Sequence, residues 1–525
     1  MNSRTQPHPP PLGGSPQQRT MVEDRDPSPD IVIVGSGMGG GAIAYGLANS
    51  GARIMLIERG EFVPQEPENW SVGAVLIGER YKVRERWQAA DGSWFQPGIN
   101  YAVGGNTKFY GAALPRYRPS DFEPVEHAEG ISPAWPFRYE NLAPFYTEAE
   151  HIFGVHGTVE AGQEQARTET FPFPPVEHEE PIGELARRLV AEGYTASHLP
   201  LGIDLRPHGG CIRCSTCDGF ACRLHAKADA DIRCVRPALS HDGVSLLTGS
   251  HATRILTDRT GSRATGVEIS SASGTRTIAA GVVIISCGAA NSAALLLRSR
   301  NAQHSQGLAN SSGVVGRHYM IHNNTIMLSA RPFRRNRAVF PKTLYVNDFY
   351  ERGVAEHPYP LGHIQLVGKL QEPMTRSRAP MAPRWMHRYV TARSIDWWLY
   401  SEDLPDPKNR VELTDDDRLR ITWTPNNLRS HELLRREARR MARSAGFPIT
   451  LMRRTGVEDC SHHAGTVRAG GDPETSALDA NCRAHDIENL YVVDSSFFPS
   501  LPVMNPALTI AANALRVAAH LRARG

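Results

Sequence analysis

The sequence predicts an α/β protein with more than one domain. Residues 31 to 60 read as a short apolar strand, a glycine-rich turn, a helix of small residues and a second strand. This order is typical of a nucleotide-binding α/β unit. The chain has 525 residues, which exceeds the usual size of one domain and allows two intertwined or sequential domains.

The composition excludes several classes of protein. A hydrophobic fraction of 40% with 22% charged residues is ordinary for a globular protein. The formal net charge of +3 gives no reason to expect nucleic acid or an anionic membrane as a partner. No run approaches the roughly 18 to 20 consecutive apolar residues of a membrane span. We therefore expect a protein that binds neither nucleic acid nor a membrane.

The first 28 residues are rich in Pro, Gln, Ser and Gly and contain no apolar segment of the secretory type. We expect a disordered tail over residues 1–28, with Met21 as a candidate for the true start. The eight cysteines are too few for a disulfide-stapled secreted protein of this length. A cytoplasmic location fits these features.

The glycines after the first strand have separate physical roles. Gly35 allows the turn, Gly37 lets the backbone approach a pyrophosphate, and Gly40 lets the helix pack closely on the strand. The helix that follows presents free N–H groups at its start. Glu58 ends the second strand, where a carboxylate accepts from ribose hydroxyls. The motif predicts a dinucleotide site without separating FAD from NAD.

The other end of the chain adds a possible chemistry. His462 and His463 stand among small residues, and residues 489–521 read as a strand, a proline-containing loop and an apolar helix opening near Asn505. Histidine is suited to proton transfer because its unperturbed pKa of about 6.5 lies near working pH. The pattern indicates a catalytic imidazole held against closely approaching backbone.

These two ends resemble the glucose-methanol-choline (GMC) oxidoreductases, FAD-dependent enzymes that oxidise alcohols. Five further segments are similar to motifs of that family and fall in the same order: residues 101–116, 135–157, 282–299, 315–322 and 401–413. The resemblance spans about residues 30 to 521. Carbohydrate-oxidising members are the most similar.

The resemblance implies an α/β FAD-binding domain (Rossmann-like, GMC type) interleaved with an α+β substrate domain that carries a large antiparallel sheet. The FAD-binding domain would comprise residues 29–120, 205–330 and 455–525. The substrate-binding domain would comprise residues 121–204 and 331–454.

The resemblance also implies the catalytic residues. The family pattern His-x-x-Gly-Thr places the imidazole four residues before Thr466, which selects His462 as the base that takes the hydroxyl proton while hydride passes to flavin N5. Asn505 would donate to the developing alkoxide, with simple helix capping as the alternative. His463 and Tyr110 are substrate-site candidates, although a packing role is the favoured reading of His463.

Fourteen residues are expected to contact the cofactor. They are Gly35, Gly37, Gly40, Glu58, Arg59, Gly104, Gly105, Asn106, Thr107, Ala252, Ala289, Asp494, Pro506 and Thr509. Family members that attach FAD covalently carry a histidine where this chain has Phe109. We therefore expect non-covalent FAD.

A cysteine cluster leaves alternatives open. The spacing of Cys211, Cys214, Cys217 and Cys222 suits zinc or an iron–sulfur cluster. Arg223 stands where a ferredoxin-like cluster usually has proline, and some family branches resemble this segment without a metal. Structural thiols or a disulfide within the cluster are favoured, so no metal is expected, with a metal or redox role as the alternative.

The substrate is expected to be a small-molecule alcohol, most plausibly a sugar, glycoside, aminosugar or aminoglycoside. Five acidic residues would favour a cationic substrate, although surface solvation explains them equally well: Asp348, Glu351, Glu402, Asp403 and Asp406. Eight aromatic residues are candidates for stacking on a sugar ring or for core packing: Trp70, Trp87, Trp94, Tyr110, Trp385, Trp397, Trp398 and Tyr400.

Other functions stay open at this point. They are oxidation of a sterol or simple alcohol, a non-redox flavin lyase, and a dehydrogenase subunit whose cysteines bind metal. The sequence does not separate O₂ from another electron acceptor.

Overall fold

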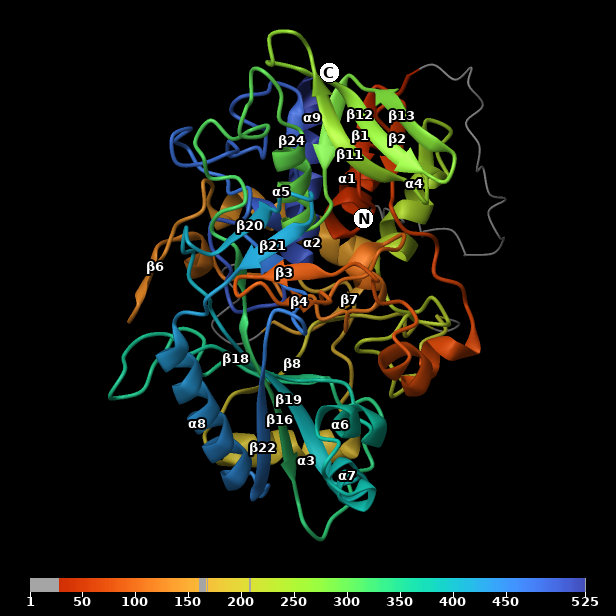
Figure 1. Cartoon of the computed structure of the whole chain (residues 1–525). Coiled ribbons are helices and arrows are strands. Elements are labelled where there is room, and N and C mark those ends of the chain that lie inside the picture. The colour runs from red at the N-terminus through yellow and green to blue at the C-terminus, as the bar shows by residue number, and fades with distance from the viewer. Residues whose placement is uncertain (1–27, 160–166, 168, 207–208, 525) are drawn as a thin grey trace, which may run out of the picture.

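A five-stranded parallel sheet forms the core of the upper body in Figure 1. Its order is β10 (Val244–Leu247), β2 (Ile54–Ile57), β1 (Ile31–Val34), β14 (Val282–Ile285) and β24 (Leu490–Val492). The three central strands are nearly continuous apolar runs, because helices and loops cover both faces of the sheet. The computed structural model describes residues 28–159, 167, 169–206 and 209–524. Except for Ser28, the predicted tail lies outside the described residues.

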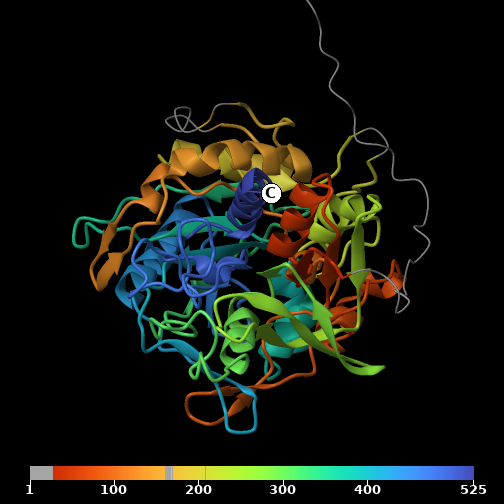
Figure 2. The same ribbon diagram turned by 90° about the horizontal axis from the view of Figure 1, so that it is seen from above.

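The helices of this body surround α9 (Ala507–Arg524), which lies at the centre of Figure 2 beside α1 (Met38–Leu47) and α2 (Tyr139–Phe153). The Tyr146 hydroxyl of α2 lies 2.7 Å from the Thr509 hydroxyl of α9, and both are buried. Trp135 donates to the Ser500 hydroxyl at 2.9 Å. Residues 135–153 therefore pack on the C-terminal segment, whereas the sequence prediction had placed them in the substrate-binding domain.

A six-stranded antiparallel sheet forms the lower body. Its order is β22 (Ile449–Thr455), β16 (Asn323–Ala330), β19 (Ser394–Ser401), β18 (His363–Leu366), β17 (Leu344–Val346) and β8 (Ala196–His198). Side chains of α3 (Glu180–Ala191) and α8 (Leu428–Ser444) share an apolar core with this sheet. Because β16 belongs to it, the domain boundary lies near residue 322 and not at 330.

A smaller sheet joins segments that the sequence prediction had placed in different domains. Strands β20 (Arg410–Leu413) and β21 (Leu419–Thr422) continue into β3 (Trp87–Ala89) and β4 (Trp94–Phe95). The β21 and β3 strands run parallel. The two bodies therefore share more structure than the predicted division allows.

The remaining elements are shorter or lie at the periphery. A three-stranded sheet contains β11 (His251–Thr257), β12 (Ala264–Ser271) and β13 (Gly274–Ala279), and α5 (Ala289–Arg298) packs on β11. The other helices and strands are α4 (Arg236–Leu239), α6 (Glu372–Arg378), α7 (Arg384–Thr391), β5 (Val125–His127), β6 (Gly130–Ser132), β7 (Val155–His156), β9 (Leu201–Gly202), β15 (Met320–Ile321) and β23 (His463–Ala464).

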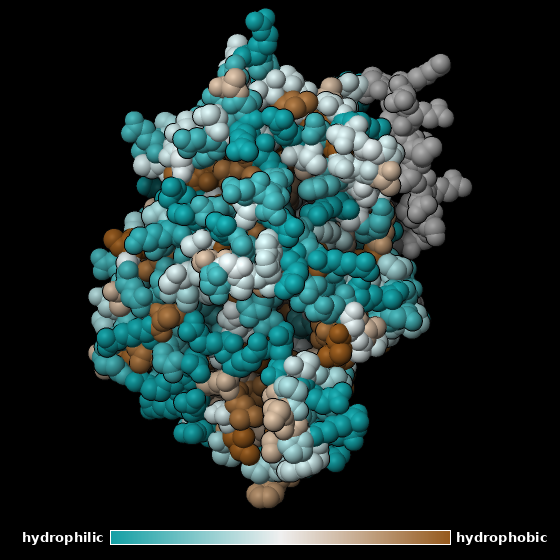
Figure 3. Space-filling view, viewed as in Figure 1, coloured by the Kyte–Doolittle hydropathy of each residue, from teal (hydrophilic) through white to brown (hydrophobic). Residues whose placement is uncertain are grey.

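The surface in Figure 3 is largely hydrophilic, with scattered apolar side chains. Within the part of the chain that the structure describes, no helix is both long and apolar enough to cross a membrane.

Candidate active site

A cavity of about 860 Å³ is bounded by both main sheets. The parallel sheet contributes the carboxyl ends of β1, β2 and β14, together with the starts of α1 and α5. The antiparallel sheet contributes side chains of β16, β18 and β19. The carboxyl edge of a parallel sheet is the usual ligand-binding edge of α/β folds.

Glycine is required at the turn after β1. Gly35 has φ +97°, and a Cβ there would lie 2.2 Å from the Ser286 carbonyl oxygen. A Cβ on Gly40 would lie 1.9 Å from the Gly35 carbonyl oxygen, so Gly40 allows α1 to pack against the turn, as predicted, without lining the cavity. Gly37 does line it. No described side chain caps the first turn of α1, which leaves its N–H groups free for an anion.

Two buried carboxylates lie at this end of the cavity. Glu58 accepts hydrogen bonds from the backbone N–H and hydroxyl of Ser36 at 3.0 and 2.6 Å, and from the Gly60 N–H at 2.9 Å. Asp494 accepts from the Gly288 N–H at 3.0 Å and from the Ser292 hydroxyl at 2.5 Å. Burial raises the pKa of both carboxyl groups, and these hydrogen bonds oppose the shift.

Most of the other predicted cofactor residues line the same cavity: Arg59, Gly105, Asn106, Thr107, Ala252, Ala289 and Pro506. Gly104 lies just behind them, with φ +91° and its N–H donated to the Ser36 hydroxyl at 3.2 Å. Thr509 is different because its buried side chain is bonded to Tyr146 and does not line the cavity. The structure therefore places Thr509 in the α2–α9 contact, and its predicted contact with the cofactor stays a prediction.

The two adjacent histidines have different surroundings. His463 lies on β23, where its Nε2 is 2.7 Å from the Cys460 carbonyl oxygen and its Nδ1 is 3.0 Å from the Tyr319 hydroxyl. Both of its ring nitrogens are therefore engaged within the protein. His463 borders the cavity, but its contacts agree with a packing role.

His462 also lines the cavity, and it contacts a histidine that the sequence prediction had not selected. Its Nδ1 lies 3.0 Å from Nδ1 of His322, and the two rings are perpendicular. No described protein group hydrogen-bonds Nε2 of His462, which is the ring nitrogen left for the cavity. Burial, then the nearby His322 and His463, lower the pKa of His462 well below 6.5. The ring is therefore neutral at neutral pH.

Asn505 lines the same cavity, two residues before α9 begins. Its Oδ1 is buried and has no hydrogen-bond partner among the described residues. A capping asparagine would use Oδ1 to accept from a backbone N–H, so the capping alternative is not realised. The Asn505 side chain interacts with the Tyr400 hydroxyl and lines the cavity.

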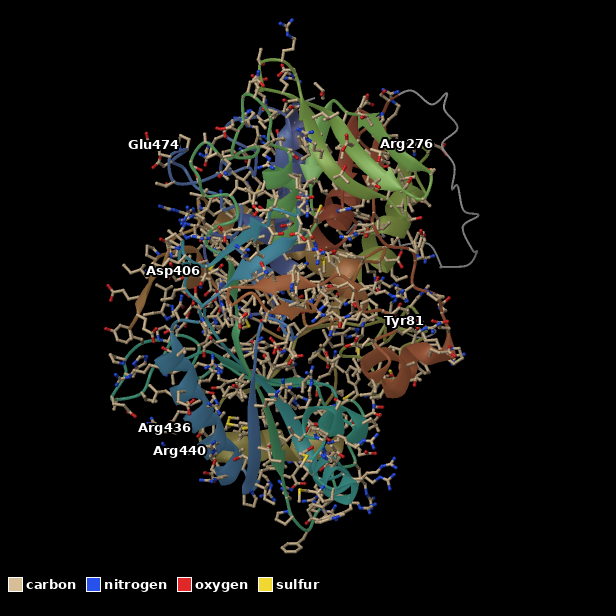
Figure 4. The ribbon with its side chains drawn as sticks, viewed as in Figure 1. Tyr81, Arg276, Asp406, Arg436, Arg440 and Glu474 are labelled. Atoms are coloured by element: carbon tan, nitrogen blue, oxygen red, sulfur yellow. The ribbon has the colours of Figure 1, made fainter. Side chains whose placement is uncertain are left out.

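The predicted acidic residues do not build the site. Asp348, Glu351, Glu402, Asp403 and Asp406 are all absent from the cavity lining, and Asp406 lies at the molecular surface in Figure 4. The suggestion that these five carboxylates attract a cationic substrate is therefore wrong. The carboxylates that do line the cavity, apart from Glu58 and Asp494, are Glu79, Asp218, Glu458 and Asp459.

Of the eight aromatic candidates, Trp87, Tyr110, Trp398 and Tyr400 line the cavity. Trp398 and Tyr400 alternate along β19 on one face, with ring centroids 5.9 Å apart. Tyr110 donates its hydroxyl to the Ala228 carbonyl, which leaves only its ring for the cavity. Tyr81, which was not predicted, also lines the cavity, and Figure 4 shows it beside the short helical segments of residues 67–77.

The cysteine cluster surrounds a separate small cavity of about 20 Å³. Cys211, Cys214, Cys217 and Cys222 are all free thiols, so the disulfide that the sequence allowed is not formed. Over the described residues, no group of three or more His, Cys, Asp or Glu side chains is arranged to hold a metal ion. Lys227 organises the loop by donating to the carbonyls of Tyr110, Cys217 and Phe220.

Comparison with known proteins decides the family. Sequence patterns described as GMC oxidoreductase match residues 189–324 and 405–514. The 6‴-hydroxyparomomycin C oxidase of Streptomyces lividus is 30% identical over 100% of this chain and 97% of its own length. The paromamine 6′-oxidase of Streptomyces fradiae is 31% identical over 97% of this chain and 94% of its own.

The chain belongs to the GMC oxidoreductases. Solved structures agree at the level of fold. Pyridoxine 4-oxidase from Mesorbium loti has a TM-score of 0.63 at 18% identity, and a formate oxidase variant from Aspergillus oryzae RIB40 has 0.66 at 15%; each comparison covers 94% of this chain and 98% of the other.

This GMC oxidoreductase is an enzyme that acts on CH–OH groups and uses FAD. Its substrate is a small-molecule alcohol, and an electron acceptor reoxidises the flavin. The residues present fit the cofactor. The uncapped start of α1 offers free N–H groups, and a Cβ on Gly37 would meet no atom within 4 Å, so this backbone is open to a phosphate.

Several residues of the site were not identified from the sequence. His322 follows β15, and Asn324 and Gln365 come from the strands β16 and β18 of the antiparallel sheet. The alternating pattern of residues 394–401 was a signal for the two aromatic residues on β19. No local signal pointed to His322, because its significance lies in a contact across 140 residues of sequence.

Proposed function

We propose that this GMC oxidoreductase oxidises a hydroxyl group on an aminosugar ring of an aminoglycoside. The observation that carries the proposal is that His462, whose Nε2 has no described hydrogen-bond partner, and Asn505 line the same cavity. The substrate class is supported by two relatives whose names place their action on paromamine and on a hydroxyparomomycin, each aligned over almost the whole chain.

FAD, when bound, supplies the acceptor for the hydride that leaves the carbinol carbon. His462 accepts the hydroxyl proton at Nε2 as the C–H bond breaks. The Asn505 amide donates to the substrate oxygen while that oxygen carries negative charge. A positioned base of this kind contributes about 10²- to 10⁴-fold in rate.

The cofactor would lie along the parallel-sheet end of the cavity. The first turn of α1 would hold the pyrophosphate, and Glu58 would accept from the adenosine ribose. Asp494 would lie near the ribityl chain, and the remaining lining residues of this end would contact the rest of the molecule. Phe109 lines the cavity where covalent members have histidine, which supports non-covalent FAD.

The sugar would lie against the antiparallel sheet. Trp398 and Tyr400 offer apolar faces of the kind that pack on saturated rings. Asn324 adds a buried Oδ1 that has no partner within the described ranges and can accept from a hydroxyl or ammonium group. The partly exposed Glu458 makes no ion pair with any described residue, so its negative charge is available to an ammonium group.

The test is anaerobic mixing of the purified holoenzyme with paromamine, followed through the visible absorbance of the flavin. We expect reduction by paromamine and none by glucose, a sterol or a simple alcohol. If one of those other compounds reduces the flavin and paromamine does not, the substrate is not an aminoglycoside and belongs to the class of the reactive compound. If none of them reduces the bound FAD, the aminoglycoside proposal fails, and an untested substrate or a non-redox role takes its place.

Admission of air after reduction separates the two classes of electron acceptor. Rapid reoxidation identifies an oxidase, whereas a persistently reduced flavin identifies a dehydrogenase that needs another acceptor.

A further inference from the structure

His322 is fully buried between the proposed base and the chain just before α9. Its Nε2 lies 2.8 Å from the Pro502 carbonyl oxygen, and its Nδ1 lies 3.0 Å from Nδ1 of His462. Only 1% of its surface is exposed. Each nitrogen of this ring therefore has one partner, and the identity of the partners fixes where the protons are.

The proton positions follow from the donor and acceptor capacities of the groups. A carbonyl oxygen can only accept, so Nε2 of His322 must carry a proton and donate it to Pro502. Burial lowers the pKa of His322 to about 4, so the ring is neutral and its Nδ1 bears a lone pair. The contact between the two Nδ1 atoms is then a hydrogen bond only if His462 donates.

We propose that His322 is a positioning residue that holds His462 in the Nδ1–H tautomer and so keeps the lone pair of Nε2 directed at the substrate hydroxyl. The structural part of this proposal concerns the two rings alone. Its catalytic consequence rests on the function proposed above.

The contact between the two Nδ1 atoms also stabilises His462 after it has accepted the substrate proton. The substrate O–H bond breaks and a proton is bound at Nε2, so His462 becomes an imidazolium ion. Its Nδ1–H then donates to His322 as a charge-assisted hydrogen bond, which is stronger than the neutral one. His322 itself does not change its protonation, because its second proton site is occupied by the donated hydrogen bond.

The surroundings contain few groups that compete for this role. His463 and Cys460 come from the same loop as His462, and Tyr400 of β19 packs against both histidine rings. The charged group that faces His322 is Glu402. None of these groups takes the place of His322 as a hydrogen-bond acceptor for Nδ1 of His462 within the described part of the chain.

Three variants distinguish a positioning effect of His322 on His462 from a general contribution of a buried histidine to the fold. His322→Leu removes the acceptor, whereas His322→Asn restores an oxygen near the position of Nδ1. His431→Gln is the matched control: His431 is equally buried and is bonded to Thr325 and Ser401, but it does not line the cavity.

The first readout needs no substrate. Solid-state NMR spectra of the holoenzyme labelled with ¹³C,¹⁵N-histidine, with His462 assigned by its loss in His462→Gln, report which ring nitrogen is protonated. We expect the Nδ1–H form in the wild-type enzyme, in His322→Asn and in His431→Gln, and a mixture or the Nε2–H form in His322→Leu. An Nε2–H tautomer in the wild-type enzyme would overturn the proposal.

The second readout is the rate constant for flavin reduction by paromamine, measured by stopped flow over a range of substrate concentrations. We expect His322→Leu to lower the limiting rate constant roughly 10- to 100-fold with unchanged FAD content and substrate dissociation constant, and His322→Asn to recover most of the loss. Equal rates in the wild-type enzyme and His322→Leu would refute the catalytic role. If paromamine fails to reduce the wild-type flavin, the proposed substrate fails, and the NMR result still decides the role of His322.

Discussion

The chemistry of this site depends on which ring nitrogen is left without a partner. His463 uses both nitrogens inside the protein, whereas His462 uses only Nδ1. Both rings border the cavity, but only His462 keeps a ring nitrogen without a partner among the described residues. The resemblance to the family selected His462 as the base, and this residue lines the cavity, but the resemblance contained no information on the proton positions.

A change of charge at position 322 gives a prediction at this scale. In the wild-type enzyme the low pKa of His462 keeps the base unprotonated, so the rate constant for flavin reduction should be flat from about pH 6 upward and fall only in more acidic solution. His322→Asp places a carboxylate beside Nδ1 and favours the imidazolium ion. We expect the apparent pKa of the reduction rate to rise by about one unit or more.

Stopped-flow reduction over pH 5 to about 9 measures this shift, with His322→Asn as the uncharged control. An apparent pKa that is equal in the Asp and Asn variants would show that position 322 does not act on the base.

At the scale of elements, the order of strands and helices around the nucleotide turn follows from the sequence, because buried parallel strands are apolar runs punctuated by glycine. The contacts of Trp135 and Tyr146 do not follow from it. Their aromatic pattern predicts burial but not which surface buries them, and the resemblance gave only the order of motifs. For the same reason, the sequence did not predict that β16 belongs to the antiparallel sheet or that β21 pairs with β3, and both cross the predicted domain boundaries.

Thr509 offers a prediction for the α2–α9 contact. Thr509→Val keeps the shape of the side chain but leaves the buried Tyr146 hydroxyl without the partner that lies 2.7 Å away. We expect a loss of about 1 to 3 kcal/mol in the free energy of unfolding with no change in flavin reduction rate. Thr509→Ser keeps the hydroxyl and is the matched control.

Urea unfolding and stopped-flow reduction of the same preparations measure the two quantities. If Thr509→Val loses FAD while its free energy of unfolding is unchanged, Thr509 contacts the cofactor and its main role is not the bond to Tyr146.

At the scale of the whole molecule, buried histidines couple stability to pH. Burial lowers the pKa of His322 and His463 to about 4 and of His363 and His431 to about 3. In the unfolded chain these rings titrate near 6.5. Between these values the unfolded state binds more protons than the folded state, so stability falls as the solution is acidified.

Buried carboxyl groups with a raised pKa, such as Glu58 and Asp494, change stability in the opposite direction. We therefore expect the histidine contribution as a difference: relative to His431→Gln, the wild-type enzyme loses free energy of unfolding as the pH falls from 6.5 toward 4. Urea denaturation at fixed ionic strength, followed by tryptophan fluorescence, measures this trend. A difference in unfolding free energy between the wild-type enzyme and His431→Gln that does not change between pH 7.5 and 5 would contradict the neutral state of this buried ring.

We propose Nε2 of His462 as the proton acceptor of the reaction. Its most direct test is a single-turnover measurement of flavin reduction by paromamine in the wild-type enzyme and in His462→Ala, each confirmed to hold FAD. We predict reduction in the wild-type enzyme and a rate lowered by about 10² to 10⁴, or about 3 to 5 kcal/mol of transition-state stabilisation, in the variant. A His462→Ala enzyme that reduces its flavin at the wild-type rate would contradict the account.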